Sequence, residues 1–263
     1  MSISKGIALV TGSAQGLGRA IALRLAQDGY DIALNDIPSK SHRLREVAHD
    51  VDKSGRKAIV LPADVTVEEQ VKEMVKEVST KLGGLDVMIA NAGVVQISTL
   101  VSTQLADWDR VMNINTRGPF LCYKYAAEQM VKQGRGGRII GASSLAGKQG
   151  YPLLSAYCAS KFAVKGLTQV AALELGRYGI TVNAYAPGLI VTPMAAGMVD
   201  ADGKFLSSDE EYSAWVMNRI EGRPIKHVGQ PEDVASIVSY LVSKEAHFIT
   251  GQTISVDGGI AMS

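Results

Sequence analysis

Residues 6–22 read Gly-Ile-Ala-Leu-Val-Thr11-Gly12-Ser-Ala-Gln15-Gly16-Leu17-Gly18-Arg-Ala-Ile-Ala, and their pattern indicates the class of fold. The apolar run at 7–10 predicts a buried strand, and the apolar positions that follow Gly18 predict a helix. A glycine turn between a strand and a helix is the setting of a dinucleotide site, because glycine lets the backbone approach a pyrophosphate and the helix N-terminus attracts its charge. The spacing here is G-x-x-x-G-x-G, whereas the commonest fingerprint is G-x-G-x-x-G.

An acidic residue follows the second predicted strand, which spans 31–35. A carboxylate at the end of this strand accepts hydrogen bonds from the adenosine ribose and repels the 2′-phosphate of NADP. Asp36 therefore predicts NAD(H) as the preferred cofactor. NADP(H) is not excluded, because the basic residues that follow could weaken the preference; they are Lys40, His42, Arg43 and Arg45. A solvated loop aspartate is the alternative interpretation.

Strand-like and helical patterns alternate along the rest of the chain. Strands are predicted at 6–10, 31–35, 57–61, 86–90, 137–142, 180–185 and 252–256. Helices are predicted at 16–28, 40–53, 67–82, about 104–133, 156–177 and 231–243. This alternation predicts right-handed βαβ units in a single α/β domain over 1–263, a Rossmann-type doubly wound fold whose seven-stranded parallel sheet has helices on both faces.

Composition narrows the class of function. The formal net charge of +1 gives no indication of a nucleic-acid partner or of an anionic membrane surface. No apolar run approaches the ~20 residues of a membrane-spanning helix, and the first strand leaves no room for a signal peptide. Cys122 and Cys158 fall in predicted helices and form no disulfide framework, so a cytoplasmic location is expected. No Cys/His spacing of a metal site is present, so no metal is expected.

Tyr157 and Lys161 stand four residues apart in the predicted helix at 156–177. Residues at i and i+4 share a helix face, so a phenol and an ammonium group lie side by side. A neighbouring cation favours the phenolate and lowers the pKa of a tyrosine, which makes the pair a candidate for proton exchange with a hydroxyl or carbonyl group. The alternative is an ordinary helix surface, because the spacing alone is common.

Taken together in order, these motifs resemble the short-chain dehydrogenase/reductase family over nearly all of the chain. The motifs that carry the resemblance are Thr11-Gly12-x-x-x-Gly16-x-Gly18, Asp64-Val65, Asn91-Ala92-Gly93, Asn115, Ser144, Tyr157-x-x-x-Lys161 and Pro187-Gly188. Within the family, the chain looks most similar to NAD-dependent acetoin or diacetyl reductases and 2,3-butanediol dehydrogenases. Stretches such as Ala-Ser-Lys161-Phe-Ala-Val-Lys-Gly-Leu-Thr-Gln support that similarity, although other branches share them.

The resemblance implies the following site residues. The catalytic residues would be Asn115, Ser144, Tyr157 and Lys161, with Ser144 and Tyr157 contacting the substrate. The cofactor would contact Gly12, Gln15, Gly16, Leu17, Gly18, Asp36, Asp64, Val65, Asn91, Ala92, Gly93, Tyr157, Lys161, Pro187, Gly188, Ile190 and Thr192. Ser143 and Asn113 are the neighbouring alternatives to Ser144 and Asn115, and the family pattern favours the latter two.

The implied function is hydride transfer between NAD(H) and a small carbonyl compound or secondary alcohol, with diacetyl, acetoin or 2,3-butanediol preferred. A polyol or sugar dehydrogenase and a 3-oxoacyl-thioester reductase are alternatives on the same fold. A nucleotide-binding regulator without turnover is a more distant one, because such a protein would be expected to lose Tyr157 or Lys161. The resemblance also implies a homotetramer.

One segment differs in composition from the rest of the chain. Residues 195–224 are polar and interrupted by glycine and charged residues, and they follow the expected nicotinamide contacts directly. Long ordered insertions commonly serve a site, so we expect this segment to form a lid over the substrate.

Overall fold

Seven parallel strands form one sheet in the computed structural model, which describes residues 4–196, 211, 214–215, 218 and 221–262. The order of the strands is β3-β2-β1-β4-β5-β6-β7. Their bounds are β1 Ile7–Thr11, β2 Asp31–Asn35, β3 Ala58–Val60, β4 Val87–Ala90, β5 Gly137–Ala142, β6 Ile180–Pro187 and β7 Thr253–Val256. The order reverses direction between β1 and β4, and in open α/β sheets such a switch point creates a crevice at the carboxyl ends of the strands.

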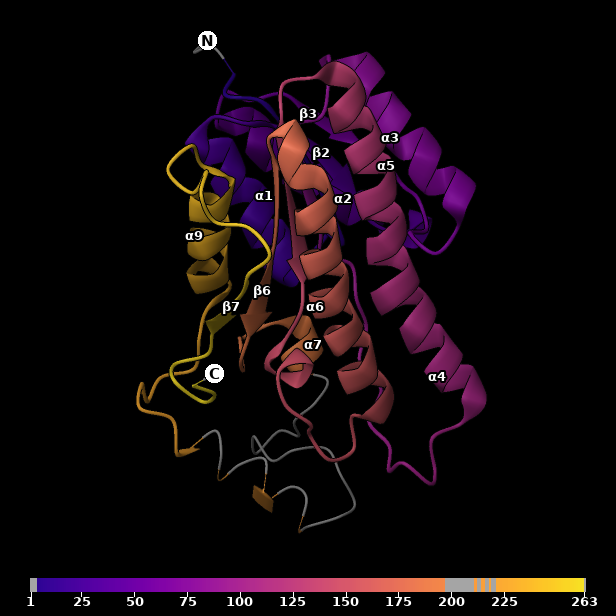
Figure 1. Ribbon diagram of the computed structural model, residues 1–263, viewed down its shortest axis with the longest axis vertical. Helices are drawn as coiled ribbons and strands as arrows, with labels where there is room; N and C mark the ends of the chain where they lie inside the picture. The colour runs from indigo at the N-terminus through magenta and orange to yellow at the C-terminus, as the bar shows by residue number, and fades with distance from the viewer. Residues whose placement is uncertain (1–3, 197–210, 212–213, 216–217, 219–220, 263) are drawn as a thin grey trace.

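Helices cover both faces of the sheet (Figure 1). One apolar layer packs α1 (Gly16–Asp28), α2 (Ser41–Lys53) and α9 (Pro231–Val242) against the strands. The other packs α3 (Glu68–Leu82), α5 (Gly118–Gln133) and α6 (Ser155–Leu175). The strands β1, β2, β4 and β6 are buried along their whole length, as expected for a sheet covered on both sides.

The limits of the helices follow from local chemistry. Helix α1 ends where Gly29 adopts a left-handed conformation with φ of 106°, which favours glycine. Helix α9 begins with Pro231 in its first turn and with a reciprocal capping box between Gln230 and Asp233. Short α7 (Pro193–Ala196) follows β6 and lies at the end of the sheet to which the β6 arrowhead points in Figure 1.

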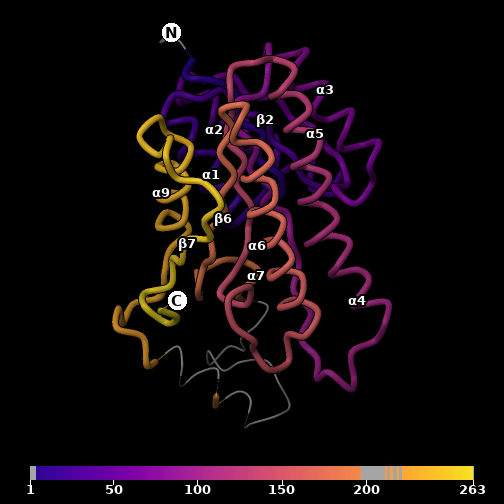
Figure 2. Tube along the Cα trace, in the orientation of Figure 1, coloured from indigo at the N-terminus to yellow at the C-terminus, as the bar shows by residue number. Residues whose placement is uncertain are grey.

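The predicted fold class is confirmed, and the predicted strands and helices agree with the structure within about two residues. The expected single helix at 104–133 is wrong in one respect. Helix α4 (Leu105–Met112) and α5 are separated by a π-helical turn at Asn113–Arg117, although the chain continues as one rod in Figure 2. Periodicity does not detect one extra residue in a turn. Most of the expected lid at 195–224 lies outside the described residues.

Candidate active site

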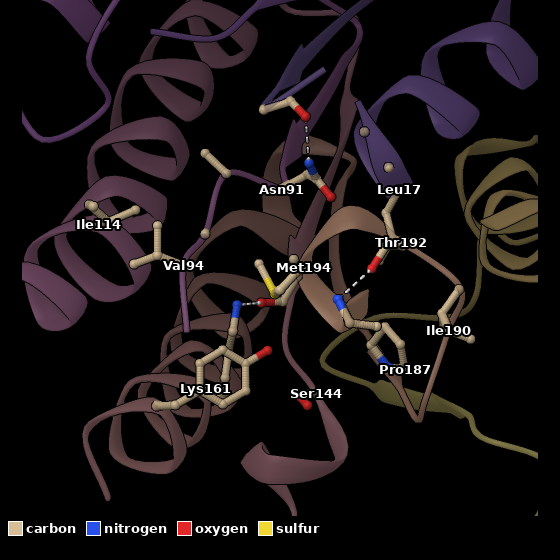
Figure 3. A pocket seen from close by; sticks show the side chains of 18 of the residues that line it. Leu17, Asn91, Val94, Ile114, Ser144, Lys161, Pro187, Ile190, Thr192 and Met194 are labelled. Carbon is tan, nitrogen blue, oxygen red and sulfur yellow. Dashed lines mark hydrogen bonds between the residues drawn. The ribbon is translucent and has the colours of Figure 1, made fainter. Parts of the chain in front are cut away.

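The carboxyl ends of the strands surround a cavity of about 540 Å³ (Figure 3). It extends from the glycine turn after β1 to the first turn of α6. This volume lies in the range of small-molecule and cofactor sites. Every residue that the sequence analysis assigned to catalysis or cofactor binding lines it except Asn115. The fold therefore brings together residues that are distant in the sequence.

The glycine turn fits a pyrophosphate. A Cβ atom on Gly12 would lie 2.9 Å from the Cα atom of Ala92, and one on Gly18 would lie 2.2 Å from the carbonyl oxygen of Gly12. Larger residues are therefore excluded at both places. Gln15 precedes helix α1 without capping it through its side chain, and the first turn contains no acidic residue. The helix N-terminus therefore keeps its positive character toward the cavity, which suits a phosphate group.

Asp36 is buried at the end of β2, and its carboxylate is held from several sides. One oxygen accepts a hydrogen bond from the amide of Ile37 at 2.9 Å, and the other accepts one from the amide of Ala14 at 3.3 Å. The ammonium group of Lys40 lies 3.6 Å away. The position is that expected of a ribose-binding carboxylate, and the adjacent cation offsets part of its charge.

Asp64 and Val65 line the same end of the cavity after β3. The carboxylate of Asp64 accepts hydrogen bonds from the amide of Thr66 at 2.9 Å and from its hydroxyl at 2.8 Å. Val65 is buried and packs against Gly118, where a Cβ atom would lie 2.9 Å from the valine methyl group. Local hydrogen bonds and packing therefore fix the positions of Asp64 and Val65 at this end of the cavity.

The segment that follows β4, residues 91–93, is hydrogen-bonded to the glycine turn. The side-chain amide of Asn91 donates to the carbonyl oxygen of Thr11 at 2.8 Å and to that of Gly12 at 3.3 Å. The hydroxyl of Thr11 accepts hydrogen bonds from the amides of Asn91 and Ala92, at 3.0 and 3.1 Å. A Cβ atom on Gly93 would approach Lys161 Nζ to 3.4 Å, so this backbone runs directly beside the candidate catalytic lysine.

The segment after β6 forms the opposite wall of the cavity. The amide of Gly188 donates to the carbonyl of Val256 at 3.0 Å, which fixes this segment to β7. Ile190 is buried and pairs with Gly229 in an isolated β-bridge. The hydroxyl of Thr192 accepts a hydrogen bond from the amide of Ala195 at 3.2 Å, so in this structure it stabilises the first turn of α7.

Ser144, Tyr157 and Lys161 converge in the cavity. Lys161 is buried and donates to the carbonyl of Ala142 at 2.8 Å, and burial lowers its pKa to about 8. Burial raises the pKa of Tyr157 to about 12, while a hydrogen bond with Ser144 opposes this shift. The expected lowering of the Tyr157 pKa is therefore wrong for this structure. Desolvation of the phenol is the largest cause of the shift, and the ammonium nitrogen of Lys161 lies 5.5 Å from the centroid of the ring.

The two adjacent serines have different partners. Ser144 Oγ accepts a hydrogen bond from the amide of Ala146 at 3.2 Å and lines the cavity close to Tyr157. Ser143 is more deeply buried, and its hydroxyl donates to the carbonyl of Lys161 at 3.1 Å. The geometry therefore favours Ser144 as the serine that meets a substrate oxygen.

Asn115 is fully buried in the π-helical turn. Its side chain accepts from the amide of Val94 at 2.9 Å and donates to the carbonyl of Val94 at 2.8 Å and to the hydroxyl of Ser160 at 3.1 Å. The side chain thus connects the segment after β4 to α6. The expected role of Asn115 in a water relay stays a prediction.

Sequence reasoning missed several residues that line the cavity. They include Val94, Ile114, Tyr151, Leu154, Tyr185 and Ile260. No local motif marks them, because they reach the cavity through the order of the strands and through the C-terminal segment. The structure shows an unusual backbone conformation next to Leu154. The preceding residue, Leu153, has φ of 67°, which is uncommon for a residue other than glycine and is often found at functional sites.

Tyr151 also contacts the segment expected to form a lid. Its ring meets that of Trp215 edge to face, with 5.7 Å between the centroids. Within the described ranges, no group of three or more His, Cys, Asp or Glu side chains is arranged to hold a metal ion. Among the helices that the structure describes, none is both long and apolar enough to cross a membrane.

A cavity that joins a glycine turn suited to a pyrophosphate with a tyrosine–lysine pair is typical of a nicotinamide-dependent oxidoreductase acting on CH–OH groups. Comparison of the chain with known proteins agrees with this class. The family model described as Enoyl-(Acyl carrier protein) reductase matches residues 12–261. The chain is 50% identical to a short-chain dehydrogenase/reductase of Armillaria gallica over 98% of this chain and 97% of that protein. The chain belongs to the short-chain dehydrogenase/reductase family, whose members use a nicotinamide nucleotide and a small-molecule substrate.

Other relatives have more specific names. The chain is 40% identical to the L-2,3-butanediol dehydrogenase of Corynebacterium glutamicum, with 97% of this chain and 98% of that one covered. It is also 40% identical to a 3-oxoacyl-[acyl-carrier-protein] reductase of Staphylococcus aureus, with the same coverage. The crystal structure of an acetoin dehydrogenase from Salmonella typhimurium superposes with a TM-score of 0.83 at 35% identity, covering 97% of this chain and 95% of that chain.

Proposed function

We propose that this protein transfers hydride between NAD(H) and a small vicinal diketone, hydroxyketone or diol, such as diacetyl, acetoin or 2,3-butanediol. The observation that carries the proposal is the meeting of Ser144 and Tyr157 in a cavity that apolar side chains also line. These side chains include Val94, Ile114, Leu154 and Met194, and Arg110 and Tyr151 line the same cavity. The likeness to a butanediol dehydrogenase and to an acetoin dehydrogenase supports the substrate class.

The cofactor proposal is NAD(H) in preference to NADP(H). It depends on the Asp36 carboxylate, which lies at the cavity with both oxygens oriented by backbone amides. A 2′-phosphate would meet this negative charge, which Lys40 at 3.6 Å offsets in part. Gly12, Gly16 and Gly18 would hold the pyrophosphate, and the segment from Pro187 to Thr192 would flank the nicotinamide.

The bound cofactor supplies the hydride, and the residues of the chain position the substrate and move the proton. Ser144 holds the carbonyl oxygen of the substrate by a hydrogen bond. Tyr157 is a protonated phenol at neutral pH, because its pKa is raised to about 12, so it donates a proton to that oxygen as negative charge develops there. Lys161, with its pKa near 8, is mostly charged at pH 7 and stabilises the phenolate that remains. Asn115 would then hold a water that returns a proton to this pair.

A panel of substrates tests this proposal. Reduction of diacetyl, acetoin, a ketose and a 3-oxoacyl thioester would be measured with NADH and with NADPH, and diol and polyol oxidation with the oxidised cofactors. The highest kcat/KM is expected for diacetyl or acetoin with NADH. A clear preference for the thioester would instead support the 3-oxoacyl reductase, which the equal identity to the staphylococcal enzyme keeps as a second candidate. NADH binding without turnover of any substrate would support a regulator.

We further propose a homotetramer. Helices α5 and α6 carry large apolar side chains on the surface of the single chain. They are Phe120, Val131, Phe162, Val170 and Leu173. A second copy that covers this surface would remove the apolar area from water, and tetramers commonly have D₂ symmetry.

A further inference from the structure

Tyr185 is a fully buried tyrosine near the carboxyl end of β6, the strand between β5 and β7. It pairs in register with Ala142 of β5, whose small side chain leaves room for the ring to cross that strand. The hydroxyl thereby reaches the end of β4, where it bonds Asn91 Oδ1 at 2.8 Å. One side chain thus spans three strands and ends beside the glycine turn.

The direction of this hydrogen bond follows from the other partners of Asn91. The side-chain nitrogen of Asn91 faces two carbonyl oxygens, those of Thr11 and Gly12, and therefore donates to both. The amide oxygen must then face Tyr185, so the phenol donates to it. Burial raises the pKa of Tyr185, which keeps this donor protonated throughout the useful pH range.

The space around the Asn91 amide admits almost no adjustment. A Cβ atom on Gly12 would lie 2.9 Å from Asn91 Nδ2, and one on Gly18 would lie 2.6 Å from the same atom. If the amide rotated, its oxygen would face the two carbonyl oxygens and repel them. The Asn91 amide thus bonds the carbonyl of Gly12 and lies directly beside Gly18, so its orientation is coupled to the glycine turn.

We propose that Tyr185 is a positioning residue of the cofactor site, which acts through Asn91 to hold the glycine turn in the shape that receives the pyrophosphate. The inference rests on the proposed function, because it assumes that NADH binds along this turn. Tyr185 also lines the cavity, but in this role it acts on the glycine turn through Asn91. Its loss is therefore expected to weaken cofactor binding rather than the chemical step.

The first test is Tyr185→Phe, followed by titration with NADH monitored by the fluorescence of the nucleotide. The loss of one buried hydrogen bond is expected to raise the Kd for NADH by about fivefold to tenfold. The KM for NADH should rise in parallel, while kcat at saturating NADH changes by less than about twofold, since uniform binding affects KM alone. An unchanged Kd for NADH would overturn the proposal.

Tyr123→Phe is the matched control. Tyr123 is also buried, and its hydroxyl shares a hydrogen bond of 3.0 Å with Thr168, outside the cavity. Both variants are expected to lower Tm by a similar amount, but only Tyr185→Phe should change the Kd for NADH. An equal loss of NADH affinity in both variants would show a general structural effect and contradict the positioning role.

A double-mutant cycle with Asn91→Ala tests the proposed route. If Tyr185 acts through Asn91, then Tyr185→Phe should change the Kd for NADH by less than about twofold when Asn91 is already absent. Full additivity of the two effects would overturn the route. A wild type that does not bind NADH at all would instead refute the proposed function, so the two failures are distinguishable.

Discussion

The Lys161 ammonium nitrogen lies 5.5 Å from the centre of the Tyr157 ring and donates its hydrogen bond to the carbonyl of Ala142. The lysine is thus anchored to the sheet, one helical turn from a phenol whose pKa is raised by burial. In this arrangement the tyrosine is prepared as an acid at neutral pH. The reverse reaction, alcohol oxidation, requires a deprotonated tyrosine and is therefore expected to accelerate as the pH rises above neutral.

Removal of the Tyr157 hydroxyl tests the proton donor. Tyr157→Phe keeps the ring and is expected to lower kcat for diacetyl reduction by about 10²–10⁴-fold, the usual contribution of general acid–base catalysis. The Kd for NADH, measured by fluorescence titration, should change little. Turnover near the wild-type rate would exclude Tyr157 as the proton donor.

The neighbouring serines provide a matched pair. Ser144→Ala removes the hydroxyl that is bonded to Tyr157, and we expect kcat to fall by about 10²-fold, as for the loss of an oxyanion-hole donor. Ser143→Ala removes a buried hydrogen bond to the carbonyl of Lys161 and should lower the free energy of unfolding by about 1 kcal/mol. If the larger loss of kcat followed Ser143→Ala, the assignment of the two serines would be reversed.

Cofactor preference should depend on the charge of Asp36. Asp36→Asn keeps one acceptor oxygen, enough for only one of the two amides of Ala14 and Ile37, and removes the repulsion of a 2′-phosphate. We expect kcat/KM with NADPH to rise by about tenfold, because one charge–charge interaction near a protein surface contributes about 1–4 kcal/mol. Kinetics with both cofactors would measure this change. A wild type that prefers NADPH would contradict the role of Asp36.

Stability should depend on pH through Lys161. Its pKa in the folded protein, about 8, lies below the 10.5 of an exposed lysine, so between these values the unfolded chain binds more protons. The contribution of Lys161 to the free energy of unfolding therefore rises with pH in that window, and below pH 8 the buried charge destabilises the fold. At pH 7, Lys161→Met should have a higher free energy of unfolding than the wild type, because it lacks the buried charge. Urea titrations should show this difference decreasing by about 1–2 kcal/mol between pH 7 and pH 9.5.

The exposed Lys132 on α5 supplies a control for that experiment, because its side chain is in contact with solvent in the folded protein as in the unfolded chain. Lys132→Met should show the same difference from the wild type at both pH values. If Lys161→Met behaved in the same way, the lowered pKa of Lys161 would be refuted.

The proposed homotetramer predicts the mass of the particle in solution. Light scattering at micromolar concentration should give four times the 27.9 kDa of the chain. Leu173, which is 86% exposed on α6, should then be covered by another copy, and Leu173→Glu should reduce the mass. Lys132→Glu, which places the same group at an exposed polar position on α5, should leave the mass unchanged. A monomeric wild type would refute the assembly.

The glycine turn and the alternation of strands and helices were sufficient to predict the fold, because both are local signals. The family resemblance assigned Asp36, Ser144, Tyr157 and Lys161 to one site, and the structure places them around one cavity. The protonation states could not be predicted from spacing, because they depend on burial. The contact between Tyr185 and Asn91 was equally hidden, since it crosses a strand that neither residue belongs to. The NAD preference, the tetramer and the cytoplasmic location stay predictions.

The π-helical turn at Asn113–Arg117 has a consequence for how this enzyme tolerates change. An α-helix advances about 100° per residue, so deletion of one residue from the turn would rotate α4 by that angle relative to α5. Ile114 would leave the cavity wall, and Asn115 would lose its bonds to Val94. Insertions and deletions between residues 105 and 133 are therefore expected to be selected against much more strongly than substitutions. Directed evolution of substrate range in this region would best be restricted to point replacements.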